Sequence, residues 1–290
     1  MILYENSIDM RLTDYGIMIP VLDSRAKQIL KHLERNEARI PCIDYNEAAS
    51  RLGEDSKDLL IKKEDLQRIH DPAYIDGLFG QGSDNGAFLE KALLGTYELI
   101  DKDGSYHRYN PDGATRPLGE LLHTILLQLS GSYMAGRLAL HAAHAMQKTQ
   151  TAEQQAAFCF FLGGGMHHAR YDHGAGFCLL NDIMCAAARI QAEGRAALVW
   201  IIDVDAHKGD GTAELCSFSR QGQAVTELIQ EGKAAVLSLS IHMGNSWPLD
   251  PETRAESVPG RAPLIDSDVE IPVFAGEESR YVQKLKEGIA

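Results

Sequence analysis

Three unbroken apolar segments, each beginning about 40 residues after the previous one, most strongly constrain the fold of this chain. They are "FCFFLGGG" from Phe158, "ALVWIIDVD" from Ala197 and "AAVLSLSIH" from Ala234. Continuous apolar runs are typical of strands buried on both faces, as in a parallel sheet. Between the first two lies "NDIMCAAARIQAEG", where Asn181 can cap a helix and Gly194 can end it. These segments therefore predict a βαβ unit.

A further unit begins near the C-terminal end of the sequence. Residues 269–273 form another apolar run, and a helical pattern starts at about Glu277. Repeated βαβ units predict an α/β fold with an open, mostly parallel sheet and helices on both faces. No shift of composition divides the 290 residues, so we predict one domain over residues 1–290.

Charge and cysteine usage exclude several classes of partner. A formal net charge of −13 argues against nucleic acid, whose phosphates require clustered lysine and arginine. The longest apolar run, residues 121–146, holds too many polar residues for a membrane span. Five cysteines without a C-x-x-C pair, and a first segment without a signal-peptide pattern, favour a reducing compartment, so we expect a cytoplasmic protein. The oligomeric state is left open.

Polar and glycine-rich segments follow each of the three predicted strands. They are "GGGMHHARYDHGAGFC", "DVDAHKGDG" and "HMGNSWP". In open α/β sheets the ligand-binding site lies at the carboxyl ends of the strands. We therefore expect these three loops to meet at one site.

Asp205 and His207 offer an oxygen and a nitrogen donor two residues apart. At the start of an extended loop both can face the same side, which would make half of a catalytic zinc site of three protein ligands. A salt-linked turn is the alternative for such a short motif. Asp203 and Asp210 flank the pair, and so many charges at a strand end favour a compensating cation.

His167 and His168 suit general acid and base catalysis at the same site. Each would need a carboxylate to orient its ring, and Asp203 and Asp210 are available for this. A structural role is the alternative for a histidine beside glycines, and we assign that role to His173.

Glycines and aromatic residues in these loops are candidates for substrate binding. The glycine run ending at Gly165 lets the backbone approach a ligand, and the run ending at Gly176 either does the same or makes a turn. Phe177 and Trp247 could line a narrow slot for an alkyl chain, with core packing as the alternative for both.

The segments "GGGMHHARYDHGAGFC", "DVDAHKGDG" and "SLSIH", in this order and spacing, resemble the zinc-dependent histone deacetylase superfamily, which includes bacterial acetylpolyamine amidohydrolases. The resemblance covers most of the chain, including "EDLQRIHDPAYIDGL" and "GSYMAGRLAL". It implies zinc-dependent hydrolysis of an N-acyl amide, either an acyl-lysine in a protein or an acylated polyamine or other small amine.

The resemblance also implies roles for individual residues. Asp205 and His207 match two of the three zinc ligands. His167 matches a histidine that acts electrostatically and as an acid, and His168 matches the base. Their carboxylate partners match Asp203 and Asp210, and the acyl-lysine tunnel matches Gly176, Phe177 and Trp247. A monovalent-cation site, expected to hold K⁺, matches Asp203, Asp205, His207, Ser240 and the carbonyl of Ile241.

Two departures from the family pattern stand out. Lys208 replaces a histidine that is common at this position, and we expect a modest effect because the position is not a ligand. The third zinc ligand and a catalytic tyrosine of the family would follow the helix that starts near Glu277, and neither is present; Asp266 and Asp268 are poor substitutes. The resemblance therefore predicts a deacetylase-like domain that lacks the C-terminal strands and loops of the fold.

Two other functions remain open at this stage. With only two zinc ligands the chain could be a catalytically inactive scaffold that binds acylated proteins without hydrolysis. An arginase-like dimanganese hydrolase would share the fold and a D-x-H loop, but the paired histidines fit the deacetylase pattern better. Neither the acyl-chain length nor the physiological substrate follows from the sequence.

Overall fold

The computed structural model of the chain describes residues 1–290 except 22–23, 37–39, 54–57, 81–82, 102, 149–156, 221–222, 224 and 251–263. The strands are β1 (Ile2–Leu3), β2 (Cys42–Ile43), β3 (Phe160–Phe161), β4 (Leu198–Asp203), β5 (Ala235–Met243) and β6 (Val269–Val273). The helices are α1 (Arg25–Arg35), α2 (Tyr45–Leu52), α3 (Lys63–Leu66), α4 (Pro72–Phe79), α5 (Ser83–Thr96), α6 (Leu121–Lys148), α7 (Asp182–Ala192), α8 (Asp210–Ser219), α9 (Val225–Gln230) and α11 (Tyr281–Ile289).

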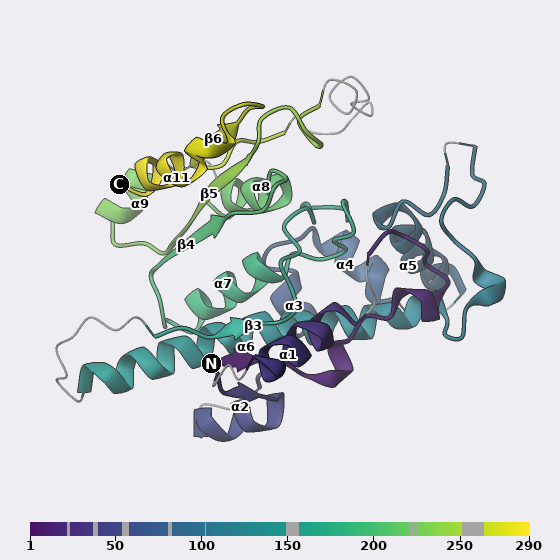
Figure 1. The fold of residues 1–290 in the computed structure, drawn as a ribbon, viewed down its shortest axis with the longest axis horizontal. Helices are drawn as coiled ribbons and strands as arrows, with labels where there is room; N and C mark the ends of the chain where they lie inside the picture. Colours follow the sequence, from purple (N-terminus) through teal and green to yellow (C-terminus); the bar gives the residue numbers. More distant parts are fainter. Residues whose placement is uncertain are drawn as a thin grey trace.

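The described strands form two open, parallel sheets (Figure 1), so the predicted α/β class with parallel strands is confirmed. The first sheet has the order β2-β1-β3 and the second the order β4-β5-β6. The apolar run from Phe158 was expected beside the run from Ala197. Instead, only two of its residues form a strand, and they pair with β1 at the start of the chain.

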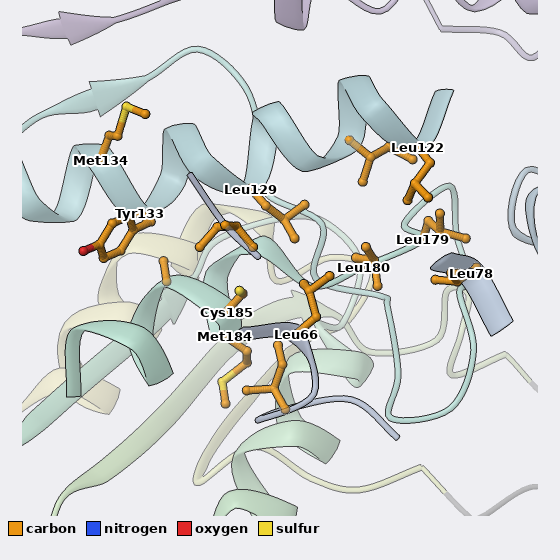
Figure 2. Close-up of a cluster of buried hydrophobic side chains, with 14 of the residues drawn as sticks. Leu66, Leu78, Leu122, Leu129, Tyr133, Met134, Leu179, Leu180, Met184 and Cys185 are labelled. Carbon is orange, nitrogen blue, oxygen red and sulfur yellow. The ribbon is translucent and has the colours of Figure 1, made fainter. Parts of the chain in front are cut away.

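A buried core joins the first half of the chain to α7 (Figure 2). Side chains of the long helix α6 pack against α7 and against the loop before it. Tyr133 and Leu129 of α6 and Met184 and Cys185 of α7 are fully buried there. As predicted, the Asn181 side chain caps α7, accepting a hydrogen bond from the amide of Met184. No helix within the described ranges is both long enough and apolar enough to cross a membrane.

The second sheet packs unequally on its two faces. Ile201 and Val236 join the core around α7, whereas Leu239 and Ile241 belong to a separate cluster with β6 and α11. Figure 1 shows α7 and α11 on opposite sides of this sheet. Helices therefore lie on both faces, as expected.

The edge strand β4 departs from the expectation that its apolar run is buried on both faces. Leu198, Trp200 and Ile202 are between 44% and 49% exposed, because β4 is the edge of its sheet and no described element covers their side of it. Val199 and Ile201 point the other way and pack in the core. The expectation of burial is correct for one face of this strand only.

Candidate active site

The loops that follow β3, β4 and β5 meet at one site, as predicted from the sequence. A cavity of about 460 Å³ is lined there by both adjacent histidines and by Asp205 and His207. Gly165, Gly176 and Phe177 contribute to the same wall. Residues from loops 40 positions apart therefore share one hollow surface at the carboxyl ends of the strands.

His167 is held by the last residue of β4. Its Nδ1 lies 2.6 Å from Oδ2 of Asp203, and the two side chains are only 9% and 11% exposed. Burial lowers the pKa of His167, but the hydrogen bond and the charge of Asp203 outweigh it, so the pKa lies above its usual value. The same hydrogen bond lowers the pKa of Asp203 against the opposing effect of burial. His167 is therefore protonated more readily than an ordinary histidine.

His168 is held by the first residue of α8. Its Nδ1 lies 2.7 Å from Oδ1 of Asp210, and both side chains are 5% exposed. Here burial is the largest effect and lowers the pKa of His168; the hydrogen bond to Asp210 opposes this, while the neighbouring His167 adds to it. The resulting pKa is below the usual value, which favours neutral imidazole.

The two imidazoles differ in charge preference although they are adjacent. Their ring centroids are 3.9 Å apart. In each ring Nδ1 faces a carboxylate, so Nε2 is the atom available to a ligand in the cavity. The pKa values of the two rings are therefore shifted in opposite directions, which is the pattern expected of an acid and a base that work as a pair.

Asp205 and His207 are much more exposed than the histidine pair. Their side chains are 52% and 43% exposed, and Nδ1 of His207 lies 3.2 Å from Oδ1 of Asp205. His167 approaches the same carboxylate, with Nε2 3.9 Å from Oδ1. One oxygen and one nitrogen donor this close suit zinc. Within the described residues, however, no group of three or more His, Cys, Asp or Glu side chains could hold a metal, so the donor set matches zinc only in part.

The aromatic candidates take different positions. Phe177 has a positive φ of 67° and stacks on Tyr97 with ring centroids 6.2 Å apart. Trp247 packs edge-on against His168, with centroids 4.6 Å apart, and does not line the cavity itself. A Cβ on Gly176 would lie 2.6 Å from both His168 and Trp247, so glycine is required for this packing.

The predicted monovalent-cation residues lie around the end of β4. Asp203 and Ser240 are partners across β4 and β5, and Ser240 and Ile241 are almost fully buried. Oδ1 of Asp203 accepts a hydrogen bond from the amide of Asp205, at 3.0 Å. The structure thus brings these residues together, while the ion itself remains a prediction.

Asp182 is a supporting residue that our sequence analysis did not single out. This fully buried carboxylate accepts hydrogen bonds from the amides of Gly165, at 3.1 Å, and Met166, at 2.7 Å, and from the Ser132 hydroxyl. It fixes the glycine run that leads into His167. Its position directly after the Asn181 cap was the available signal, because an aspartate in the first turn of a buried helix needs donors nearby.

Comparison with known families agrees with the predicted resemblance. A model of the histone deacetylase domain matches residues 20–289. The chain belongs to this family. The match spans both sheets apart from β1, and it includes every candidate site residue named above.

Individual proteins align with this chain over shorter segments. An uncharacterized protein of Picosynechococcus sp. is 52% identical over 50 residues, which is 17% of this chain and 17% of that protein. The acetoin utilization protein AcuC of Staphylococcus aureus strain MRSA252 is 43% identical over 169 residues, 58% of this chain and 36% of AcuC. Histone deacetylase HDAC1 of Drosophila melanogaster is 37% identical over 62 residues, 21% of this chain and 12% of HDAC1. The aligned part is well below two thirds of each relative.

Proposed function

We propose that this chain carries the acid, the base and two zinc donors of a deacetylase that hydrolyses N-acyl amides. The observation that carries the proposal is the pair of buried histidines, each with its own carboxylate, which open on the same cavity as Asp205 and His207. Family membership supports hydrolysis of an acylated amine as the reaction class. The substrate would be an acyl-lysine of a protein, or an acylated polyamine or other small amine.

The histidines divide the proton transfers of amide hydrolysis between them. Neutral His168 takes a proton at Nε2 from the attacking water, while the oxygen of that water bonds to the amide carbon. His167, whose pKa is raised by the hydrogen bond and charge of Asp203, donates a proton to the amide nitrogen as the C–N bond breaks. Asp203 and Asp210 keep Nδ1 of each ring occupied, so that both transfers occur at Nε2.

Asp205 and His207 would hold the zinc, and Asp203, Asp205, His207, Ser240 and Ile241 would hold K⁺. When bound, zinc supplies Lewis-acid polarisation of the amide carbonyl and the attacking water. Gly165, Gly176, Phe177 and Trp247 would border the acyl-amine chain. Five free cysteines fit the reducing environment of the cytoplasm, where we place the protein.

Acetate release tests this function. The chain, with and without equimolar zinc, is incubated with an acetyl-lysine peptide or an N-acetylated polyamine, and acetate and free amine are quantified. Equal amounts of both products, formed only with zinc, are expected. No product from either substrate under either condition would reject hydrolysis by this chain.

A second function is favoured by the partial donor set. With two zinc donors among the described residues, the chain could bind acylated lysine without hydrolysing it. Saturable binding of the acetyl-lysine peptide, with no acetate released, would support this scaffold. The same titration with the unacetylated peptide is the matched control, because a scaffold that reads acylation must discriminate between the two.

A further inference from the structure

A lysine is completely buried directly beside the candidate zinc donor His207. The Lys208 side chain is 0% exposed, whereas that of His207 is 43% exposed, so the two residues point to opposite sides of the loop. Nζ of Lys208 donates a hydrogen bond to Oε1 of Glu270 on β6 and lies 3.5 Å from Asp266, whose side chain is exposed. A buried ammonium is strongly unfavourable without such a partner.

Glu270 belongs to a polar row across the second sheet. Asp203 pairs with Ser240, and Ser240 pairs with Glu270, so the three residues stand next to one another on β4, β5 and β6. Paired residues of neighbouring strands share a face of the sheet. The Lys208 side chain therefore spans β5, from the loop after β4 to the far strand of the sheet.

Other contacts hold Glu270 in place at this position. Its Oε2 accepts a hydrogen bond from the amide of Ser267, at 2.8 Å. Nε2 of His242 lies 3.2 Å from Oε1, although not in a hydrogen-bonding geometry. The carboxylate is thus held on β6 by a contact that does not involve the lysine, so it can anchor the loop.

The other long-range contacts of the loop go to β5 and to the histidine pair, where Asp210 contacts His168. His207 and Asp205 bond mainly to each other, through the amide of His207 at 2.8 Å and through its ring. The amide of Met243 donates to the carbonyl of Ala206, at 2.9 Å, and that of Gly209 lies 3.5 Å from Oγ of Ser240. The charged contact of Lys208 is therefore the strongest attachment of this loop to β6.

We propose that Lys208 is a positioning residue that ties the loop from Asp205 to Asp210 to Glu270, and so sets the position of His207 and of Asp210, the partner of His168. The inference rests on the proposed function, because it concerns the geometry of that site. It also assigns Lys208 and Glu270 to one unit: the ammonium at position 208 requires the carboxylate at position 270.

Two single variants, their double variant and a matched control test this tether in the apo chain. Lys208→Met keeps a long, unbranched side chain but leaves Glu270 without its cation. Lys208→Met with Glu270→Gln removes both charges. Lys233→Met is the control, because Lys233 is 54% exposed and forms a surface ion pair with Glu231. Glu270→Gln is the second single variant. The melting temperature and the rate of amide hydrogen exchange of residues 204–211 are measured for every variant.

Lys208→Met and Glu270→Gln are each expected to lower the melting temperature by roughly 5–10 °C. The first leaves the partly buried Glu270 without its cation, and the second leaves the buried ammonium with only the exposed Asp266 as a partner. The double variant recovers most of this loss, but exchange of residues 204–211 stays at least about tenfold faster than in the wild type, because the tether is absent. If the Lys208–Glu270 pair only stabilised the fold, the melting temperature and the exchange rate of the double variant would both return toward their wild-type values. Lys233→Met changes neither.

The proposal would be overturned if residues 204–211 of the double variant exchanged their amide hydrogens at the wild-type rate. It would also be overturned if Lys208→Met changed neither the melting temperature nor the exchange rate. If Lys208→Met does not fold, the exchange rate of the double variant decides: faster exchange than in the wild type supports the tether, and the wild-type rate overturns it. Acetate release by the wild type is recorded separately. Its absence counts against the proposed function, whereas the exchange result bears on the tether alone.

Discussion

His167 and His168 line the same cavity as Asp205 and His207, but the two pairs of residues are held in different ways. His167 and His168 are buried, and each contacts a carboxylate at the end of a regular element, β4 or α8. Asp205 and His207 are about half exposed and contact mainly each other. The proposed acid and base are thus oriented by the fold itself, whereas the proposed metal donors form an open pair that would need a further ligand.

The largest expected effect is on turnover and comes from replacing a buried histidine. Replacing His168 with Ala removes the base, so turnover of an acetyl-lysine peptide should fall by about 10²–10⁴-fold. Zinc content, measured after desalting, should be unchanged, because His168 is not among the proposed donors. His173→Ala is the control, since His173 pairs with Asp172 outside the cavity lining. Full activity of His168→Ala would refute the proposed base.

The next largest effect is on zinc affinity and comes from replacing an exposed donor. His207→Ala removes one of two proposed donors, so zinc affinity in competition with a chelator should fall by at least about 100-fold, beyond the loss expected from a supporting residue. The melting temperature of the apo chain should stay within about 2 °C, because an exposed side chain contributes little to stability. Unchanged zinc affinity would remove His207 from the site.

A stability comparison sharpens the contrast further. Asp210→Ala leaves a buried imidazole N–H without its acceptor, so the free energy of unfolding should fall by about 1–3 kcal/mol. Asp205→Ala, at a half-exposed position, should change it by less than about 0.5 kcal/mol. Denaturant unfolding of both apo variants measures the difference. Equal losses of unfolding free energy would mean that Asp205 contributes as much to stability as Asp210, so the difference in burial would have no energetic consequence.

Much of the site could be predicted from the sequence because its determinants are local. Strand β6 and helix α7 coincide with their predicted segments, since an apolar run and an Asn cap act over a few residues. Asp205 and His207 are neighbours in a single loop. Their proximity follows from the two-residue spacing alone.

The rest depends on contacts between distant segments. The pairing of β3 with β1 joins two-residue strands from opposite halves of the chain, and such short strands carry no distinct pattern. Lys208 and Glu270 are 62 positions apart, and no spacing rule relates them. The exposure of Trp200 likewise follows from the position of β4 at a sheet edge, which an apolar run does not reveal.

The smallest expected effect separates the two histidines from each other. The folded pKa of His167 is raised, so its contribution to stability is complete below the unfolded value of about 6.5 and is lost as pH rises through the folded value. For His168 the folded pKa is lowered, so stability is lost as pH falls below about 6.5. His167→Gln should therefore reduce the loss of stability as pH rises, and His168→Gln should reduce the loss of stability as pH falls. Melting curves of the apo variants between pH 5 and 8.5 measure this. Parallel shifts of both variants at all pH values would mean that the two buried imidazoles share one protonation state, and the division into acid and base would fail.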